Sequence, residues 1–237
     1  MGDPESLAFF LSYINKKYQY DRLFLIFIGH GQAYTGMLFD QNHGDDGLTI
    51  DDLTKGLGSW DIDLVGFDSC MMGCLEVLSA LSPSASYLIA SEEAEPADGW
   101  PYKPWISYIS AHPDESVEQY AKNLTDEYMK TPGQGKTIAL LNPKEADYLT
   151  ERLDRFAKDL HALAGDEEGC RTIACILSQT QQFGRTGTGE LQETTMDLYS
   201  FADEARLTVP YLSKSAEEVR EGINRTVIFA RHDAMVP

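Results

Sequence analysis

A cysteine and a histidine stand at comparable places in this sequence. Cys70 follows 62–67, a short apolar run with a β-branched valine that is typical of a buried strand. His30 and Gly31 follow a second hydrophobic run within LFLIFIGHG at 23–31. A thiol and an imidazole at the carboxyl ends of two parallel strands are the parts of a nucleophile and its acid/base partner.

The residues after Cys70 predict how its thiol would be activated. From Met71 onward the apolar residues have helical spacing, which places Cys70 where a strand end meets a helix start. Unpaired N–H groups at a helix N-terminus favour negative charge and would stabilise the thiolate. Cys74 lies one turn along the same predicted helix, and we expect it to fill the core.

Four short sequences carry a resemblance to a known family: HG at 30–31, DSCMMGCLEV at 68–77, YLIASEE at 87–93 and GWPY at 99–102. They resemble the clostripain family of cysteine peptidases, which shares the caspase-type fold with gingipains, legumain and separase. His30 precedes Cys70 by 40 residues, near the roughly 50 of caspases.

The resemblance implies a catalytic dyad, with Cys70 as nucleophile and His30 as general acid/base. It further implies that the backbone N–H groups of Gly31 and Cys70 form the oxyanion hole. The alternative for Cys70 is a buried structural thiol, the common fate of a lone cysteine. The matching context around both residues favours the nucleophile.

The resemblance also implies cleavage after Arg or Lys, the P1 residue of the substrate. Asp68 and Asp98 are candidates for the acidic floor of the S1 pocket that would bind this side chain, because a carboxylate pairs with a guanidinium through two parallel hydrogen bonds. The alternative for Asp68 is a cap on the helix predicted near Met71. If neither aspartate binds, Glu92 or Glu93 would form the pocket. Candidates to line the cleft are Ser91, Trp100 and Tyr102.

The order of the predicted elements favours an α/β fold with three layers, in which helices cover both faces of a mostly parallel sheet. The loop at 92–105 would lie at the carboxyl edge of the sheet, where such folds bind ligands. We expect one clostripain-like catalytic domain over 1–237, without some N-terminal and C-terminal core strands of the family. Predicted strands lie at 23–28, 36–40, 62–67, 86–91, 136–142 and 225–230, and predicted helices at 5–18, 48–57, 71–81, 114–130, 143–164, 170–180 and 213–223.

Composition limits the partners of this chain. It has 237 residues, 43% hydrophobic, and a net charge of -19. Such a surface repels nucleic acid and anionic membranes and mildly attracts cationic peptides, although acidity is more often only a solubility trait. No stretch approaches the roughly 18 apolar residues that span a bilayer. The first residues, MGDPESLAFF, lack the features of a signal peptide, whereas the resemblance implies a secreted or cell-envelope bacterial enzyme.

We expect no required cofactor and no metal in the catalytic site. The cysteines at 70, 74, 170 and 175 fit neither a disulfide scaffold nor the usual zinc spacing, and no C-x-x-C redox motif is present. The sequence DQNHGDDG at 40–47 faintly resembles an EF-hand loop, but Asp51 stands where that loop needs glutamate. Calcium therefore stays open as a weakly supported ligand.

The sequence thus predicts a cysteine endopeptidase that cleaves after basic residues. The alternative is a catalytically silent caspase-like binding module, which would be expected to lose the cysteine or the histidine. Between Gly31 and Ser69 the only Arg or Lys is Lys55, inside the predicted helix at 48–57. We therefore expect the chain to stay uncut across that segment.

Overall fold

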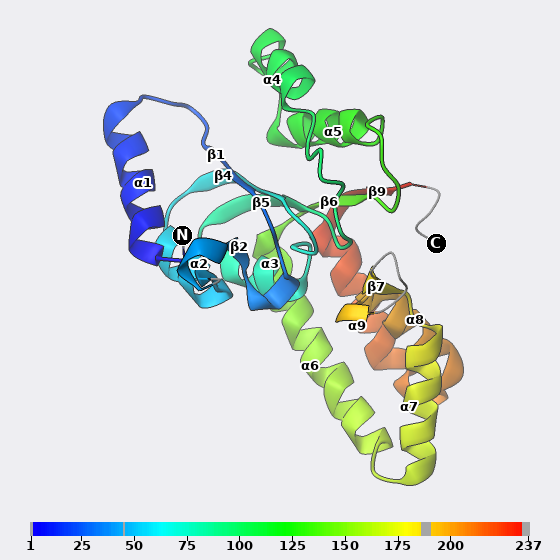
Figure 1. The fold of residues 1–237 in the computed structure, drawn as a ribbon. Helices are drawn as coiled ribbons and strands as arrows, with labels where there is room; N and C mark the ends of the chain where they lie inside the picture. The colour runs from blue at the N-terminus through cyan, green and yellow to red at the C-terminus, as the bar shows by residue number, and fades with distance from the viewer. Residues whose placement is uncertain (1, 45, 186–190, 234–237) are drawn as a thin grey trace. The chain divides into compact units, whose positions relative to one another are not determined.

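The computed structural model describes residues 2–44, 46–185 and 191–233. These residues form two compact units, one of Met1–Lys144 with Ile228–Pro237 and one of Glu145–Val227. The larger unit holds the central sheet and both catalytic candidates (Figure 1). The single catalytic domain over 1–237 stays a prediction.

The central sheet has five strands in the order β1-β4-β5-β6-β9. Neighbours β1, β4 and β5 pair in parallel, whereas β6 runs antiparallel to β5. The bounds are β1 Phe24–Ile28, β4 Ile62–Asp68, β5 Ala85–Ala90, β6 Thr137–Leu141 and β9 Val227–His232. The predicted α/β class with a mostly parallel sheet is confirmed.

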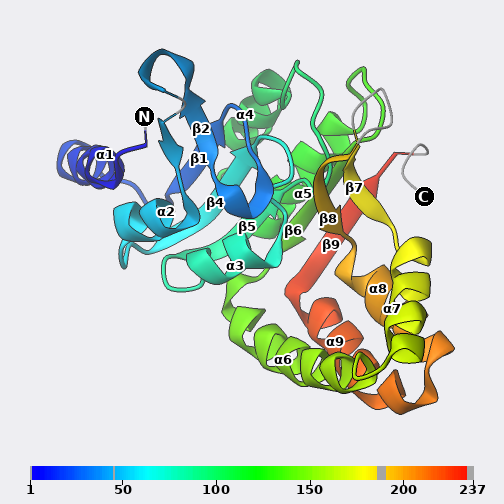
Figure 2. The same cartoon turned by 60° about the horizontal axis from the view of Figure 1, so that its bottom comes forward.

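Helices cover both faces of this sheet, as predicted. Helices α4 (Tyr102–Ala111) and α5 (Val117–Tyr128) lie on one face, and α2 (Ile50–Leu57) and α3 (Leu75–Leu81) lie on the other (Figures 1 and 2). Helix α1 (Pro4–Lys17) packs against α2. The three layers explain why β4 is buried along almost its whole length: both of its faces meet apolar side chains.

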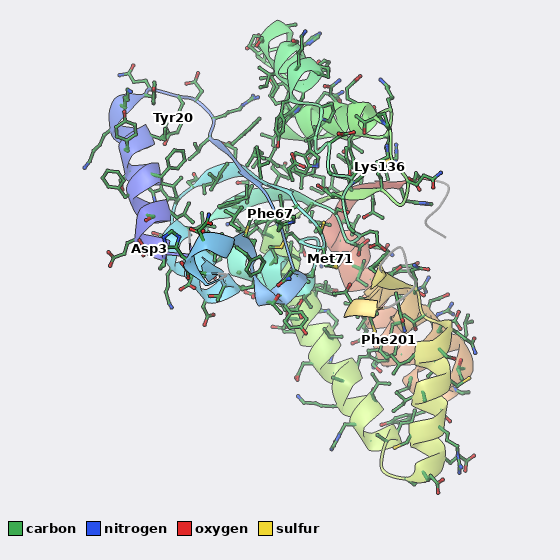
Figure 3. The ribbon with its side chains drawn as sticks, in the orientation of Figure 1. Asp3, Tyr20, Phe67, Met71, Lys136 and Phe201 are labelled. Atoms are coloured by element: carbon green, nitrogen blue, oxygen red, sulfur yellow. The ribbon has the colours of Figure 1, made fainter. Side chains whose placement is uncertain are left out.

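Side chains alternate across β4 and assign each residue to a face. Leu64 joins the core beneath α4 and α5, together with Trp100. Phe67, labelled in Figure 3, stacks instead on Phe27 with ring centroids 5.2 Å apart. By this alternation Asp68, the last residue of β4, belongs to the same face as Leu64 and Trp100.

Several helix starts are where the sequence predicts them, because capping is local. The Asp3 carboxylate accepts from the N–H groups of the first turn of α1, and Thr49 and Ser116 cap α2 and α5 in the same way. Helix α4 was not predicted. Pro101 precedes its first residue, and Pro104 lies in its first turn, where a helix tolerates proline. Two prolines so close together nevertheless argue against a helix when only the sequence is considered.

A small antiparallel hairpin follows β1. It consists of β2 (Met37–Asp40), which was predicted, and β3 (Asp46–Leu48), which was not. A second antiparallel pair belongs to the other unit and joins β7 (Gln182–Arg185) to β8 (Leu191–Met196). The sequence FGRTGTGE at 183–190 is polar and rich in glycine, which predicts a loop; residues 183–185 instead lie in β7, and 186–190 lie outside the described residues.

The smaller unit is mainly helical. Helix α9 packs against both α6 and α8, and α7 packs against α8. Phe201, labelled in Figure 3, lies in the core of this unit. Its ring meets that of Phe156 edge to face, with centroids 5.7 Å apart. The helices of the unit are α6 Ala146–Leu163, α7 Glu167–Gln179, α8 Leu198–Thr208 and α9 Ser213–Thr226.

Candidate active site

His30 and Cys70 occupy equivalent places at neighbouring strand ends. Ile28 on β1 is the register partner of Asp68 on β4, so the histidine and the cysteine each lie two residues beyond a paired position. The contact continues past the sheet: a Cβ atom added to Gly31 would lie 2.5 Å from the Cys70 carbonyl oxygen. The structure therefore brings the His-Gly and Cys segments together, and only glycine fits at Gly31.

The predicted helix start at Met71 is wrong. Met71 has a left-handed backbone, with φ of +60°, and α3 begins only at Leu75 (Figure 3). The N–H of Met71 donates to the carbonyl of Glu93, and that of Gly73 donates to the carbonyl of Ser91. These bonds tie the connection after Cys70 to the loop after β5, so its amides are not available to a helix.

Two further expectations depended on that helix and are therefore also wrong. Asp68 does not cap α3, because the N-cap residue is Cys74. Cys74 is therefore not in the helix interior, although it is half-buried, and burial raises the pKa of its thiol to about 12. Cys70, in turn, does not lie at a helix N-terminus.

The Cys70 thiol is half-buried in a mixed environment. Burial raises its pKa; the N–H of Glu95, 3.3 Å from Sγ, opposes this effect, and the charge of Glu95 adds to it. The thiol is thus not activated in advance by a helix dipole. A proton acceptor is required for it to become a nucleophile, and His30 is exposed at the adjacent strand end.

Backbone donors are present beside the thiol. Within the described residues, neither the Gly31 N–H nor the Cys70 N–H donates to a backbone carbonyl. The segment that carries Gly31 is held by bonds from Leu38 N–H to the His30 carbonyl and from Gln32 N–H to the Gly36 carbonyl, both 2.9 Å. Two unengaged donors on a fixed backbone have the chemistry of an oxyanion hole.

The side chain of Asp68, two residues before Cys70, accepts two hydrogen bonds through one carboxylate oxygen. Its side chain is 6% exposed, and Oδ2 accepts from Trp100 N–H at 3.1 Å and from the Tyr102 hydroxyl at 2.7 Å. Gly99 has φ of +64°, and a Cβ there would lie 2.9 Å from the same oxygen. The segment at 99–102 therefore wraps closely around this carboxylate.

The other predicted S1 residues occupy different positions. Trp100 is buried in the core beneath α4 and α5 and reaches Asp68 through its backbone. Ser91 is fully buried, and its hydroxyl contacts Thr137 Oγ1 at 2.8 Å and donates to the Glu93 carbonyl at 2.9 Å. Through these bonds Ser91 supports the loop after β5, and because it is fully buried it does not line a cleft. Asp98 is exposed on the loop.

Glu95 is the residue that the sequence analysis missed. Its Oε1 accepts from Trp100 Nε1 at 3.2 Å, and its carboxyl group lies within interaction range of the Asp68 carboxylate. Burial raises the pKa of Glu95 to about 9, and the charge of Asp68 adds to this effect. The sequence holds no periodic signal for it: acidic residues crowd 92–98, and only the folded loop distinguishes them.

The described part of the chain contains neither a cluster of metal-binding side chains nor a helix that could span a membrane. No group of three or more His, Cys, Asp or Glu side chains there could hold a metal ion. In the segment considered for calcium, His43 Nδ1 lies 2.7 Å from Asp40 Oδ2. Among the helices of the described residues, none has the length and apolar character needed to cross a bilayer.

A histidine and a cysteine thus stand just beyond adjacent strand ends of a mostly parallel sheet that has helices on both faces. The chain matches the clostripain family over residues 1–234, and it belongs to that family. Clostripain of Hathewaya histolytica is 29% identical over an alignment of 131 residues, and the match covers 47% of this chain. The match spans only 25% of that protein.

Solved structures show the same fold. A secreted C11 cysteine protease from Bacteroides thetaiotaomicron, in complex with an irreversible peptide inhibitor, has a TM-score of 0.69 at 18% identity. That comparison covers 97% of this chain and 63% of the other. A clostripain from the same organism, in complex with the peptide inhibitor BTN-VLTK-AOMK, has a TM-score of 0.61 at 21% identity and covers 83% and 79%.

Proposed function

We propose that this chain is a cysteine endopeptidase that cleaves after Arg or Lys through a dyad of Cys70 and His30. The observation that carries the proposal is the buried carboxylate of Asp68, two residues before the nucleophile and on a strand end beside His30. Family membership supports the reaction type, and this carboxylate supports the choice of a cationic P1 side chain.

The reaction follows from the roles of these groups. His30 removes the Sγ proton of Cys70, and the thiolate attacks the scissile carbonyl. The resulting oxyanion accepts hydrogen bonds from the N–H groups of Gly31 and Cys70. His30 then gives its proton to the leaving amine, and the thioester is hydrolysed by a water molecule that His30 deprotonates.

Specificity for a basic P1 residue has two further supports. The related clostripain structure carries an inhibitor whose peptide part, VLTK, ends in lysine. The net charge of -19 would also attract cationic peptides at low ionic strength. Asp98, exposed on the same loop, stays a predicted contributor to the S1 pocket.

We propose the cofactor requirement and the location of this protein by analogy with the clostripain family. The dyad mechanism requires no cofactor, and calcium, if bound, would act on the 40–47 segment without entering the reaction. A relative described as secreted favours action outside the cytoplasm. The partners we propose are peptide or protein substrates, without nucleic acid.

A peptidyl-Arg chloromethylketone tests the proposal. We expect a mass gain on the Cys70 peptide, none on that peptide in the Cys70→Ala variant, and no turnover by Cys70→Ala or His30→Ala. Cys175→Ala is the matched control, since this exposed cysteine lies in the smaller unit and should leave labelling unchanged.

Two results would overturn the proposal. Turnover above a few per cent in either dyad variant would remove the assigned roles. Absence of Cys70 labelling and of any peptide cleavage by the wild type would favour the alternative, a catalytically silent binding module.

A further inference from the structure

We propose that Glu95 is a specificity-determining residue of the S1 pocket, and that a P1 arginine entering the pocket expels a proton from its side chain. This inference rests on the proposed preference for basic P1 residues. Its consequence is that peptides with P1 arginine bind more tightly as the pH rises, whereas neutral peptides do not.

The N–H and O–H donors of the surrounding residues reach only one oxygen of each of the two carboxyl groups. Asp68 uses Oδ2 for Trp100 N–H and Tyr102 OH, and no N–H or hydroxyl group of the described residues donates to Oδ1. Glu95 uses Oε1 for Trp100 Nε1, and its Oε2 is buried without such a donor in the described chain. In the free protein a side-chain hydrogen bond joins the protonated Glu95 to Asp68, and a guanidinium would replace that proton with donors for both carboxyl groups.

The bonds that Trp100 makes hold these carboxyl groups side by side. Its backbone N–H binds Asp68 and its indole N–H binds Glu95, while the ring is packed in the core. The backbone N–H of Glu95 also contacts the Cys70 sulfur at 3.3 Å. Glu95 thus links the reacting atom to the carboxylate that would bind P1, which is the position expected of a residue that selects the substrate.

The groups facing Glu95 explain why it holds a proton in the free enzyme. They come from the end of β4 (Asp68, Cys70), the start of α4 (Tyr102) and the end of α5 (Tyr128), and all are neutral or acidic. None of the ion pairs of the described residues includes Glu95. Burial and the Asp68 charge raise its pKa to about 9, so Glu95 is largely protonated near neutrality.

A cationic P1 side chain favours the ionised form of Glu95 over the protonated form. When a guanidinium enters, the O–H bond of Glu95 breaks, the proton leaves to solvent, and two carboxylates face one positive charge. Binding linked to the loss of one proton strengthens at most about tenfold per pH unit and levels off above the pKa of the free group. Citrulline has the shape of arginine without the charge and should release no proton.

Calorimetry on the inactive Cys70→Ser protein tests this directly. A peptide with P1 arginine is titrated at pH 7.5 in two buffers of different ionisation enthalpy, which gives the number of protons released. We expect close to one proton for the parent, none for the added Glu95→Gln change, and the parental value for Glu5→Gln, a surface glutamate of α1.

Rates supply a second readout. The ratio of kcat/KM for P1 arginine over P1 citrulline should rise from pH 6 to pH 9 in the wild type and stay flat in Glu95→Gln. The two proteins should converge at pH 6 and differ by about 10-fold or more at pH 9. The ratio cancels the titration of the Cys70 and His30 groups, which both substrates need.

The outcomes separate the two proposals. Tight binding of the arginine peptide with no proton release by the parent would overturn the role of Glu95 and leave basic specificity intact. Equal binding of arginine and citrulline peptides would overturn basic specificity itself. Because the parent alone decides the proton count, a Glu95→Gln protein that failed to fold would not block the test.

Discussion

Replacing Glu95 by glutamine should make this protein more stable at alkaline pH. In the folded chain Glu95 has a pKa of about 9, raised by burial from an ordinary value of 4.5. The folded state therefore binds a proton that the unfolded state releases between these values. Stability from this group is fully present below about pH 4.5 and is lost as the pH rises towards 9.

The magnitude follows from the size of that window. Each pH unit inside it lowers the free energy of unfolding by about 1.4 kcal/mol, so the whole window corresponds to at most about 6 kcal/mol. Glutamine resembles the protonated acid: it can accept from Trp100 Nε1 through its oxygen and present an amide towards Asp68. The variant should therefore lack this pH dependence.

Urea unfolding of wild type and Glu95→Gln at pH 5, 7 and 8.5 provides the measurement. We expect the difference in free energy of unfolding to grow in favour of the variant by on the order of 3 to 5 kcal/mol between the extremes. Other titrating groups cancel in the difference, and Glu5→Gln should track the wild type. A difference that stayed constant across pH would refute the reasoning, because Glu95 would then titrate alike in both states.

Three further results are expected. Asp68→Asn should lower kcat/KM for P1 arginine substrates by roughly 30- to 150-fold, with far less effect on thermal unfolding, because one charge-assisted partner is lost; normal cleavage would assign the pocket to another acid. Lys136→Met should lower the free energy of unfolding by about 3 kcal/mol or more, since the buried Nζ donates to the carbonyls of Tyr128, Met129 and Thr131; an unchanged urea midpoint would contradict this. On gels with intact-mass readout, wild type at neutral pH should remain uncut at Lys55, which lies inside α2; fragments joining there, absent from Cys70→Ala, would disprove it.

The strands of the central sheet, several helix caps and the positions of His30 and Cys70 beyond strand ends could be predicted because their signals are local. Thr49 and Ser116 bond to N–H groups three residues away, and the hydrophobic runs before His30 and Cys70 are continuous in sequence. These signals place both side chains at strand ends without any knowledge of distant contacts.

The absence of a helix at Met71 and the buried surroundings of Glu95 could not be predicted, because long-range bonds decide both. The residues after Cys70 have helical spacing, yet their N–H groups bond to carbonyls some twenty residues later in the chain. Glu95 differs from Glu92 and Glu93 only in facing Asp68 and Trp100 after folding. Neither Glu95 nor the residues next to it in the sequence carry a signal for these contacts.

The absence of a helix start at Cys70 has a consequence for its reactions with small molecules. Hydrogen peroxide and iodoacetamide react with thiolates, and a half-buried thiol of raised pKa is largely protonated near neutrality. We expect Cys70 to resist both reagents at rates closer to an ordinary thiol than to a pre-ionised one. Covalent inhibitors directed at Cys70 should therefore owe their speed to the side chain that occupies the proposed S1 pocket, and little to the intrinsic reactivity of the electrophile.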